Sequence, residues 1–466
     1  MRFPLPILIL SGATVILTGC ASLRTNKTQY AGVDVMLAKA DYPAALVQIE
    51  AAKEKTYRFK DRVIYYLDTG MLYHWNGEYE KSNKQLEQAE RAIAENFTKS
   101  LTRSAGTLIL NDNVQDYAGE DYEDIYLNAF KALNYLALGE NDSAFVEVRR
   151  INNKLLQLES KYDHVAEQMN KAEEAHEEFR PGKSYFQESA LGRYLSMLLY
   201  RNDYKWDDVR IDLEKISKGW KLQPDIYTFD LPDFAKETER ISPPTARLNI
   251  IAFSGIAPDK KAATFHIYTE KDLIILAGTS ENYLGKQNLS GLAVLPWFGV
   301  EPGYNFKFQL PSMHKRPSKV DRIEVVVRDA DPQDLQPLES LENVAMETFG
   351  VRKPIIYMKT LTRAVVKGLA TQTATQQVTN NLGSGLAFFT RVATTVLVNK
   401  TENADLRMSR FFPATASINE LHLKEGLYDI RVNYYSKSGT LLHSDKREQI
   451  SVKAGTLNLL QSAYLN

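Results

Sequence analysis

Hydrophobic positions in the first half of the chain recur every three or four residues, which is the spacing of one face of an amphipathic helix. Two such faces precede turns that contain glycine, and their residues are Tyr66, Gly70 and Tyr73, then Tyr126, Ala132 and Tyr135. The turns follow at Gly77 and Gly139, and each leads into another segment of helical spacing. This pattern predicts helical hairpins in which small residues allow two backbones to approach closely.

The second half of the chain alternates hydrophobic and polar residues. Short β-branched or aromatic runs, separated by Gly, Pro and Asn, predict strands at 248–253, 264–268, 273–277 and 323–327. Helical spacing returns at 337–349 and 355–370, and alternation resumes at 416–423, 428–435, 441–446 and 449–453. Only Pro43 and Pro181 lie between residues 20 and 222, whereas thirteen prolines follow residue 222. Because proline breaks helix interiors, the first part can be mostly helical and the second cannot.

The sequence therefore predicts an α+β multidomain protein, with an irregular N-terminal helical array followed by a β-rich, sandwich-like C-terminal region with a few helices. The expected segments are a leader at 1–19, the array at 20–222, a proline-containing connector at 223–246 and the β-rich region at 247–466. Within the last segment, residues 414–466 read as an antiparallel meander.

The N-terminus carries a short apolar stretch from Leu5 to Leu17 after a single basic residue, Arg2. This stretch is too short for a comfortable membrane span and is typical of a secretory signal. The only cysteine of the chain follows in Leu17-Thr18-Gly19-Cys20, which resembles the bacterial lipobox. The resemblance implies cleavage before Cys20 and acylation of Cys20 with diacylglyceryl and palmitate-type chains. Several acyl chains on one residue give a durable membrane anchor.

Charge and cysteine content exclude several classes of protein. The 466 residues include 57 Lys and Arg against 58 Asp and Glu, and the net charge of -1 gives no electrostatic case for a nucleic-acid-binding protein. A single cysteine excludes an intramolecular disulfide and any zinc or iron–sulfur site built from cysteines. The seven histidines lie far apart without ligand spacing, so the sequence predicts no metal site and no cofactor.

Several segments resemble those of a larger family. The run NDNVQDYAGEDYEDIYLNAFKALNYLALGENDSAFVEVRRIN begins at residue 111, and the later segments are GIAPDKK at 255–261, TLTRAVVK at 360–367, ADLRMSRFFP at 404–413 and GLYDIRV at 426–432. Together they resemble a family of tetratricopeptide-like bacterial lipoproteins, described mostly as uncharacterised. The resemblance implies a degenerate helical repeat array and no catalytic residues. Because Cys20 is followed by Ala and Ser, without Asp, it also implies retention at the outer membrane, facing the periplasm.

Two inserts interrupt the helical pattern. Residues 153–183 are rich in Lys, Glu and Gln and predict a long solvated helix or helical hairpin that projects from the array. Residues 111–126 gather six acidic side chains that could surround a calcium ion, but no frame supplies both the Gly and the Glu of an EF-hand loop. Capping of the following helix and its dipole explain these acids more simply.

Motifs of nucleotide-binding loops, serine hydrolases and zinc peptidases are all missing from the sequence. We therefore expect a non-enzymatic, lipid-anchored envelope protein that acts as a protein–protein interaction or assembly scaffold in the periplasm. Tyr66, Tyr73, Tyr126 and Tyr135 are candidates either for partner binding or for internal packing. The expected partners are the membrane, through the lipidated N-terminus, and another envelope protein.

Two alternatives remain open on the sequence. One is a factor that binds cell-wall glycan or polysaccharide, or that regulates a synthase. The resemblance implies the latter through members encoded near lipoproteins that activate peptidoglycan synthases. Aromatic residues lining a cleft in the C-terminal region would favour glycan binding. The other is a periplasmic hydrolase of unrecognised type, which requires two converging carboxylates or a Ser-His pair in a concave site.

Overall fold

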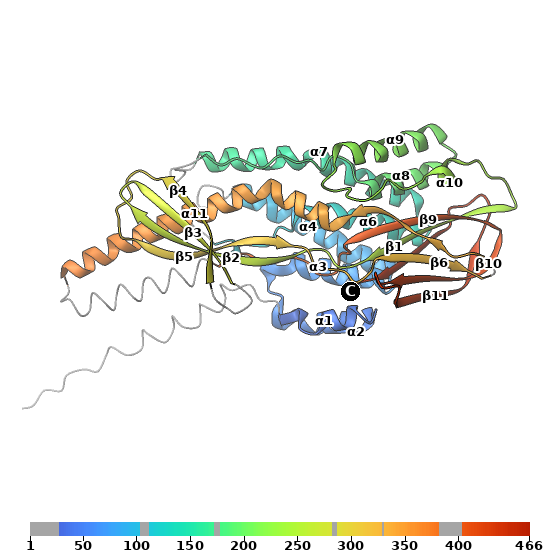
Figure 1. The fold of residues 1–466 in the computed structure, drawn as a ribbon, viewed down its shortest axis with the longest axis horizontal. Coiled ribbons are helices and arrows are strands. Elements are labelled where there is room, and N and C mark those ends of the chain that lie inside the picture. The colour runs from blue at the N-terminus through green and yellow to red at the C-terminus, as the bar shows by residue number, and fades with distance from the viewer. Residues whose placement is uncertain (1–27, 103–110, 172–177, 282–286, 329, 382–402) are drawn as a thin grey trace, which may run out of the picture.

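The computed structural model describes residues 28–102, 111–171, 178–281, 287–328, 330–381 and 403–466. Cys20 and the predicted leader at 1–19 lie outside the described residues. The chain forms a helical region followed by β-sheets, so the predicted α+β multidomain class is confirmed (Figure 1).

The helical region is built mainly from antiparallel hairpins. Its helices are α1 (Val33–Leu37), α2 (Tyr42–Thr56), α3 (Arg62–Trp75), α4 (Tyr79–Thr102), α6 (Asp121–Ala137), α7 (Asn141–Asn170), α8 (Ala190–Asn202), α9 (Trp206–Leu222) and the short α10 (Ala235–Thr238). Single turns of 3-10 helix lie at Thr28–Tyr30, Phe59–Asp61 and Asp112–Val114. The hairpins are α3 with α4, α6 with α7 and α8 with α9, and they pack side by side.

Glycines allow the first two hairpins to turn and the first of them to pack closely. Gly77 and Gly139 have φ angles of 75° and 78°, which L side chains rarely adopt, and each lies just after the helix that it ends. Gly70 lies where α3 meets α4, and a Cβ there would lie 2.7 Å from Leu86 Cδ2. Ser82 Oγ donates to the Gly70 carbonyl at 2.7 Å. The small residue that the sequence places in this helix therefore permits close packing of the two backbones.

Twelve described strands form three four-stranded sheets. They are β1 (Thr245–Ser254), β2 (Asp259–Glu270), β3 (Leu273–Glu281), β4 (Gln287–Pro296), β5 (Asn305–His314), β6 (Arg322–Val327), β7 (Gln333–Asp334), β8 (Gln336–Ser340), β9 (Thr415–Lys424), β10 (Gly426–Tyr435), β11 (Leu441–Val452) and β12 (Leu459–Tyr464). The central sheet has the order β12-β1-β9-β8, the terminal sheet β11-β10-β6-β7 and the outlying sheet β4-β3-β2-β5. Only the pair of β1 with β12 is parallel within the central sheet.

The central sheet lies between the helical array and the terminal sheet. Leu248 and Ile250 of β1 share a core with Val325 of β6 and Val432 of β10, as in a β-sandwich. Alternate residues of β1, including Phe253, face the other way and share one core with α3, α6 and α8. The C-terminal region of the chain therefore covers the inner side of the helical array. The two halves share one hydrophobic core.

The long helix α11 (Leu341–Asn381) joins the central and outlying sheets. Its middle part, around Leu361 and Val365, packs on Ile267, Phe306 and Phe308 of the outlying sheet. Figure 1 shows α11 running along that sheet to one end of the molecule. The sequence predicts two separate helices around Pro354, but the structure has one. Pro354 cannot donate to the Gly350 carbonyl, and the Gly182 N–H donates to the neighbouring Val351 carbonyl at 2.7 Å, so another segment contacts the helix at this turn.

Two further predictions differ from the structure. The insert at 153–183 is helical through Asn170, but it does not project into solvent, because Leu158, Tyr162 and Met169 of α7 are buried against α11. The expected meander at 414–466 is divided between two sheets. The reason is that β9 pairs with β1, β10 pairs with β6 and β11, and β12 returns to lie parallel to β1.

Candidate functional site

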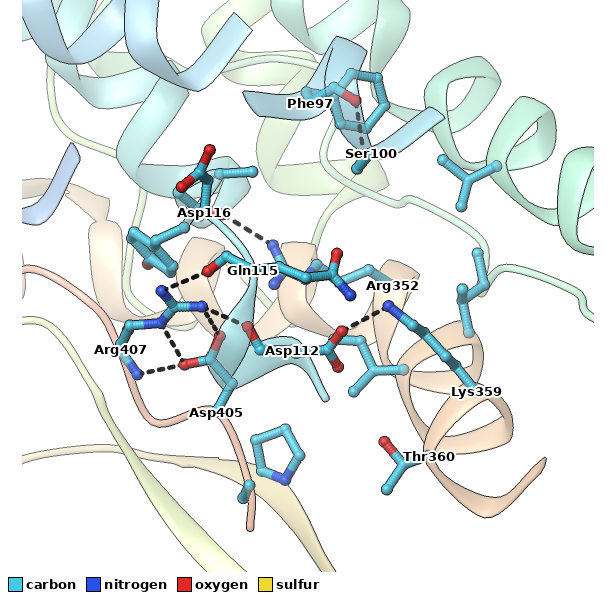
Figure 2. A pocket seen from close by; sticks show the side chains of 18 of the residues that line it. Phe97, Ser100, Asp112, Gln115, Asp116, Arg352, Lys359, Thr360, Asp405 and Arg407 are labelled. Carbon is cyan, nitrogen blue, oxygen red and sulfur yellow. Dashed lines mark hydrogen bonds and ion pairs between the residues drawn. The ribbon is translucent and has the colours of Figure 1, made fainter. Parts of the chain in front are cut away.

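A cavity of about 170 Å³ lies where the helical array, α11 and the outlying sheet meet (Figure 2). We call it the junction cavity. It collects residues from four of the segments that carry the family resemblance, although these are distant in sequence. They are Asp112 from the acidic insert, Lys260, the pair Thr360 and Arg363, and Arg407.

Arg407 organises one side of the junction cavity. Its guanidinium donates to Asp405 through two bonds of 2.9 and 2.7 Å and to Asp61 at 3.0 Å. It also donates to the carbonyls of Gln115 at 3.0 Å and Asp112 at 2.7 Å. Burial would raise the pKa of the Asp405 carboxyl, but the charge of Arg407 outweighs it and holds that pKa well below the usual range. The carboxylate is therefore ionised, and this cluster fixes residues 403–407 against the array.

A second ion pair forms the floor of the junction cavity. Lys359 Nζ lies 2.6 Å from Asp112 Oδ1, and Arg363 is one helical turn further along α11. Burial opposes ionisation of Asp112, yet the charges of Lys359 and Arg363 prevail and lower its pKa. Figure 2 shows Lys359 reaching from α11 to Asp112, beside the Arg407 cluster. Positive charges from α11 thus face the loop that precedes α6.

Buried acids at the start of α6 form ion pairs with three more cations of the lining. Glu120 pairs with Lys260 and lies 3.3 Å from Arg352, while Asp121 lies 2.7 Å from Lys161. The Glu120 and Glu123 side chains also complete a capping box. Capping thus accounts for Glu120 and Glu123, whereas Asp112, Asp116 and Asp121 form ion pairs with Lys359, Arg62 and Lys161. The described residues hold no group of three or more potential metal ligands.

The opposite wall of the junction cavity is apolar. Its side chains come from α4, α7 and α11, and they are Phe97, Val165, Met169, Ile355 and Ile356. Lys161 Nζ lies 4.5 Å from the centre of the Phe97 ring, so the charged and apolar parts meet there. A volume near that of a cavity that accepts benzene suits a single aromatic or branched side chain, or a small amphipathic group, more than a whole nucleotide cofactor.

The lining combines charged and apolar side chains with a single serine in α4. Its described residues include no histidine and no cysteine. Ser100 Oγ donates to the Phe97 carbonyl in its own helix at 2.7 Å. The pKa values of Asp112 and Asp405 are both lowered by neighbouring cations, so both carboxyls are held ionised.

The tyrosines proposed from the sequence lie elsewhere. Tyr126 is fully buried, and its hydroxyl donates to Glu339 at 2.8 Å. Tyr66, Tyr73 and Tyr135 are half-buried against the main core, and Tyr73 donates to Glu50. None of the four lines the junction cavity. Cys20, the proposed lipidation site, lies outside the described residues.

Sequence reasoning missed Asp112, Lys359 and Arg407 as members of one site. The available signal was the set of resembling segments, each of which brings charged residues next to apolar ones. The spacing could not show their convergence, because Asp112 and Arg407 are 295 positions apart.

Comparison with models of protein families, with curated proteins and with solved structures finds no match to this chain. Within the described residues, no helix has the length and apolar character needed to cross a membrane.

Proposed function

We propose that this chain is a lipid-anchored protein of the bacterial cell envelope that binds another envelope component without catalysis, as an interaction or assembly scaffold. Its place is the periplasmic side of the outer membrane, with the lipid on Cys20. The observation that carries the binding role is the junction cavity, which combines an apolar wall with a floor of fixed ion pairs. The lipobox-like sequence ending at Cys20 supports the location.

The architecture supports a binding site at the junction cavity rather than along the helical array. The inner side of the array is occupied by β1, β9 and residues around Phe411 and Phe412, so it offers no long groove to a partner. Arg407 and Lys359 come from separate segments, and both bind the loop around Asp112. These contacts hold the segments around the junction cavity in place. A partner would insert an apolar side chain against Phe97 and Met169, with polar groups facing the ion pairs.

A cavity-filling substitution tests this proposal. We expect Val165→Trp to fill the apolar wall and to lower in-cell cross-linking to the bound envelope component at least about tenfold, because an anchor side chain carries much of the binding energy. The matched control is Leu156→Trp on the same helix, where the leucine is 80% exposed and does not line the cavity. The measurement is cross-linking from the lipidated protein in intact cells, compared among wild type and both variants.

Thermal unfolding of both variants separates loss of binding from loss of folding. A cross-linked product that survives in Val165→Trp, or that disappears equally in Leu156→Trp, would remove the junction cavity from the proposed function. No product at all in wild type would contradict the scaffold role.

A further inference from the structure

A second cavity, of about 340 Å³, lies between the helical array and the strands β11 and β12. We call it the edge cleft, because both strands lie at an edge of their described sheets. Residues 443–447 of β11 and 461–463 of β12 line one side. The other side is lined by residues at or next to the ends of α2, α3 and α4, which are Ala40, Tyr42, His74, Trp75 and Tyr79. None of these residues lines the junction cavity, so the two sites are separate.

His74 brings an unpaired hydrogen-bond acceptor to the edge cleft. The residue is only 4% exposed, and its Nδ1–H donates to Asn134 Oδ1 at 2.6 Å. The Asn134 amide is fixed in this orientation, because its NH2 group donates to Ser82 Oγ at 2.9 Å and to Asn83 Oδ1 at 2.8 Å. Burial lowers the pKa of His74 to about 4, so Nε2 carries no proton at neutral pH. No described residue bonds to Nε2, which therefore needs a donor in the cleft.

The rest of the lining combines a free hydroxyl with charges that are mostly paired. Tyr79 is half-buried, its ring centre lies 5.9 Å from that of His74, and its hydroxyl bonds to no described residue. Burial raises the pKa of Tyr79, so this hydroxyl stays protonated and can both donate and accept. Arg447 Nε lies 2.9 Å from Asp445 Oδ1, which leaves only Lys446 as a further charge of the lining.

This chemistry favours a neutral ligand that carries hydrogen-bond donors. A carboxylate would bring only acceptor oxygens to His74 Nε2, which is itself an acceptor. An ammonium ligand would meet a lining that already has one acidic and two basic side chains, Asp445, Lys446 and Arg447. Neither an anion nor a cation therefore matches both the inner acceptor and the charges of β11.

Two other kinds of neutral ligand also match the lining poorly. A flat nucleobase is held best between parallel rings, but Trp75 lies edge-on to His74 with an angle of 80° between their planes. An extended peptide would need the open backbone edge of β12. Tyr42 occupies that edge, because its hydroxyl donates to the Ala463 carbonyl at 3.0 Å and accepts from the Leu465 amide at 3.4 Å.

We propose that the edge cleft binds a neutral sugar, one hydroxyl of which donates to His74 Nε2. Each sugar hydroxyl both donates and accepts, so a neighbouring hydroxyl can bond to Tyr79. The apolar C–H face of the sugar ring would contact the aromatic rings of Tyr42 and Trp75. The cleft has the size of a small-molecule site, which is about 300–1,000 Å³. This proposal does not depend on the function of the junction cavity.

Isothermal titration calorimetry tests the proposal. The sample is the chain from residue 20 onward with Cys20→Ser, which contains every described residue and cannot be acylated. The probes are glucose, N-acetylglucosamine and maltose, with inorganic phosphate and choline as charged comparisons. We expect at least one of the neutral sugars to bind and neither charged probe to do so.

Two substitutions assign the binding to the edge cleft. His74→Phe keeps an aromatic ring but removes the acceptor, so it should weaken sugar binding at least about tenfold. The matched control is His314→Phe, at an exposed histidine of β5 outside the cleft, and it should leave binding unchanged. Tyr79→Phe removes a single hydroxyl and should weaken binding about three- to tenfold. Thermal unfolding of all three variants shows whether each one is folded.

A spectroscopic measurement on the unsubstituted ring keeps the result interpretable if His74→Phe harms folding. The nitrogen-15 chemical shift of His74 Nε2 should be that of an unprotonated nitrogen and should change when the bound sugar is added. The absence of binding by all three neutral sugars would overturn the proposal, and so would binding of phosphate or choline alone. Sugar binding that is unaffected by His74→Phe and Tyr79→Phe, or that leaves the Nε2 shift unchanged, would overturn it equally.

Discussion

Replacing Glu339 by Ala is expected to destabilise the protein by about 3–5 kcal/mol, because it leaves several buried donors without an acceptor. Glu339 lies in β8 with no exposed surface. Its carboxyl accepts from Ser189 Oγ at 2.7 Å, from the Leu191 amide at the start of α8, and from Tyr126 at 2.8 Å. The Tyr227 hydroxyl is 3.4 Å away. One side chain thus joins α6, α8 and the connector to the central sheet, and denaturant unfolding measures its loss.

The Glu339 carboxyl should also make the stability of the folded protein depend on pH. Burial raises the pKa of Glu339 from 4.5 to about 7, despite its hydrogen bonds. Between these values the folded protein keeps a proton that the unfolded chain releases. Stability therefore falls as pH rises from about 4.5 to about 7, by about 3 kcal/mol for this group, and then levels off.

Glu339→Gln isolates this effect, since glutamine does not titrate. We expect wild type to gain stability relative to the glutamine variant as the pH is lowered from 7 to 5. Unfolding free energies measured across this range give the comparison. A difference between the two proteins that stays constant with pH would show that Glu339 has an ordinary pKa or is not buried as described.

Arg407→Ala should cost about 3–5 kcal/mol as well, because it leaves two largely buried carboxylates and two carbonyls without their guanidinium partner. Asp405 and Asp61 would both lose their guanidinium partner, and so would the carbonyls of Gln115 and Asp112. The control is Arg447→Ala on β11, whose side chain is 49% exposed and whose pair with Asp445 at 2.9 Å should contribute no more than about 1 kcal/mol. Denaturant unfolding of both variants provides the measurement.

Substitutions of Arg407 should weaken partner binding as well as stability. Arg407→Ala removes the bonds that fix residues 403–407 at the junction cavity, so partner cross-linking should fall together with stability. Arg407→Lys retains the charge but cannot reach four acceptors with one ammonium group, so its effect should be intermediate. Equal stability of Arg407→Ala and Arg447→Ala would contradict the role assigned to the Arg407 cluster.

Local signals predicted much of the fold. Proline distribution separated the helical half from the β-rich half, and the glycines at 77 and 139 marked the ends of α3 and α6, because a positive φ is needed there. Gly70 was correctly placed at a close contact between helices. These features depend on residues close together in the sequence, where sterics and periodicity act directly.

Long-range features could not be predicted in the same way. The sequence of β9 to β12 alternates as a meander would, but alternation does not say which sheet a strand joins. Pro354 indicated a break in α11, but the helix continues through it, with the Gly182 N–H donating to the nearby Val351 carbonyl. The junction cavity depends on ion pairs between segments such as Asp112 and Lys359, 247 positions apart, whose charges alone resemble those of any solvated surface.

Acylation of Cys20 is the claim on which the proposed location and orientation depend. The most direct measurement is growth of a bacterial host with labelled palmitate, followed by isolation of the protein and of its Cys20→Ser variant. We predict label in the wild-type protein and none in the variant, together with release of the variant from the membrane fraction. Unlabelled wild-type protein, or a Cys20→Ser variant that still fractionates with membranes, would contradict a lipid-anchored envelope protein.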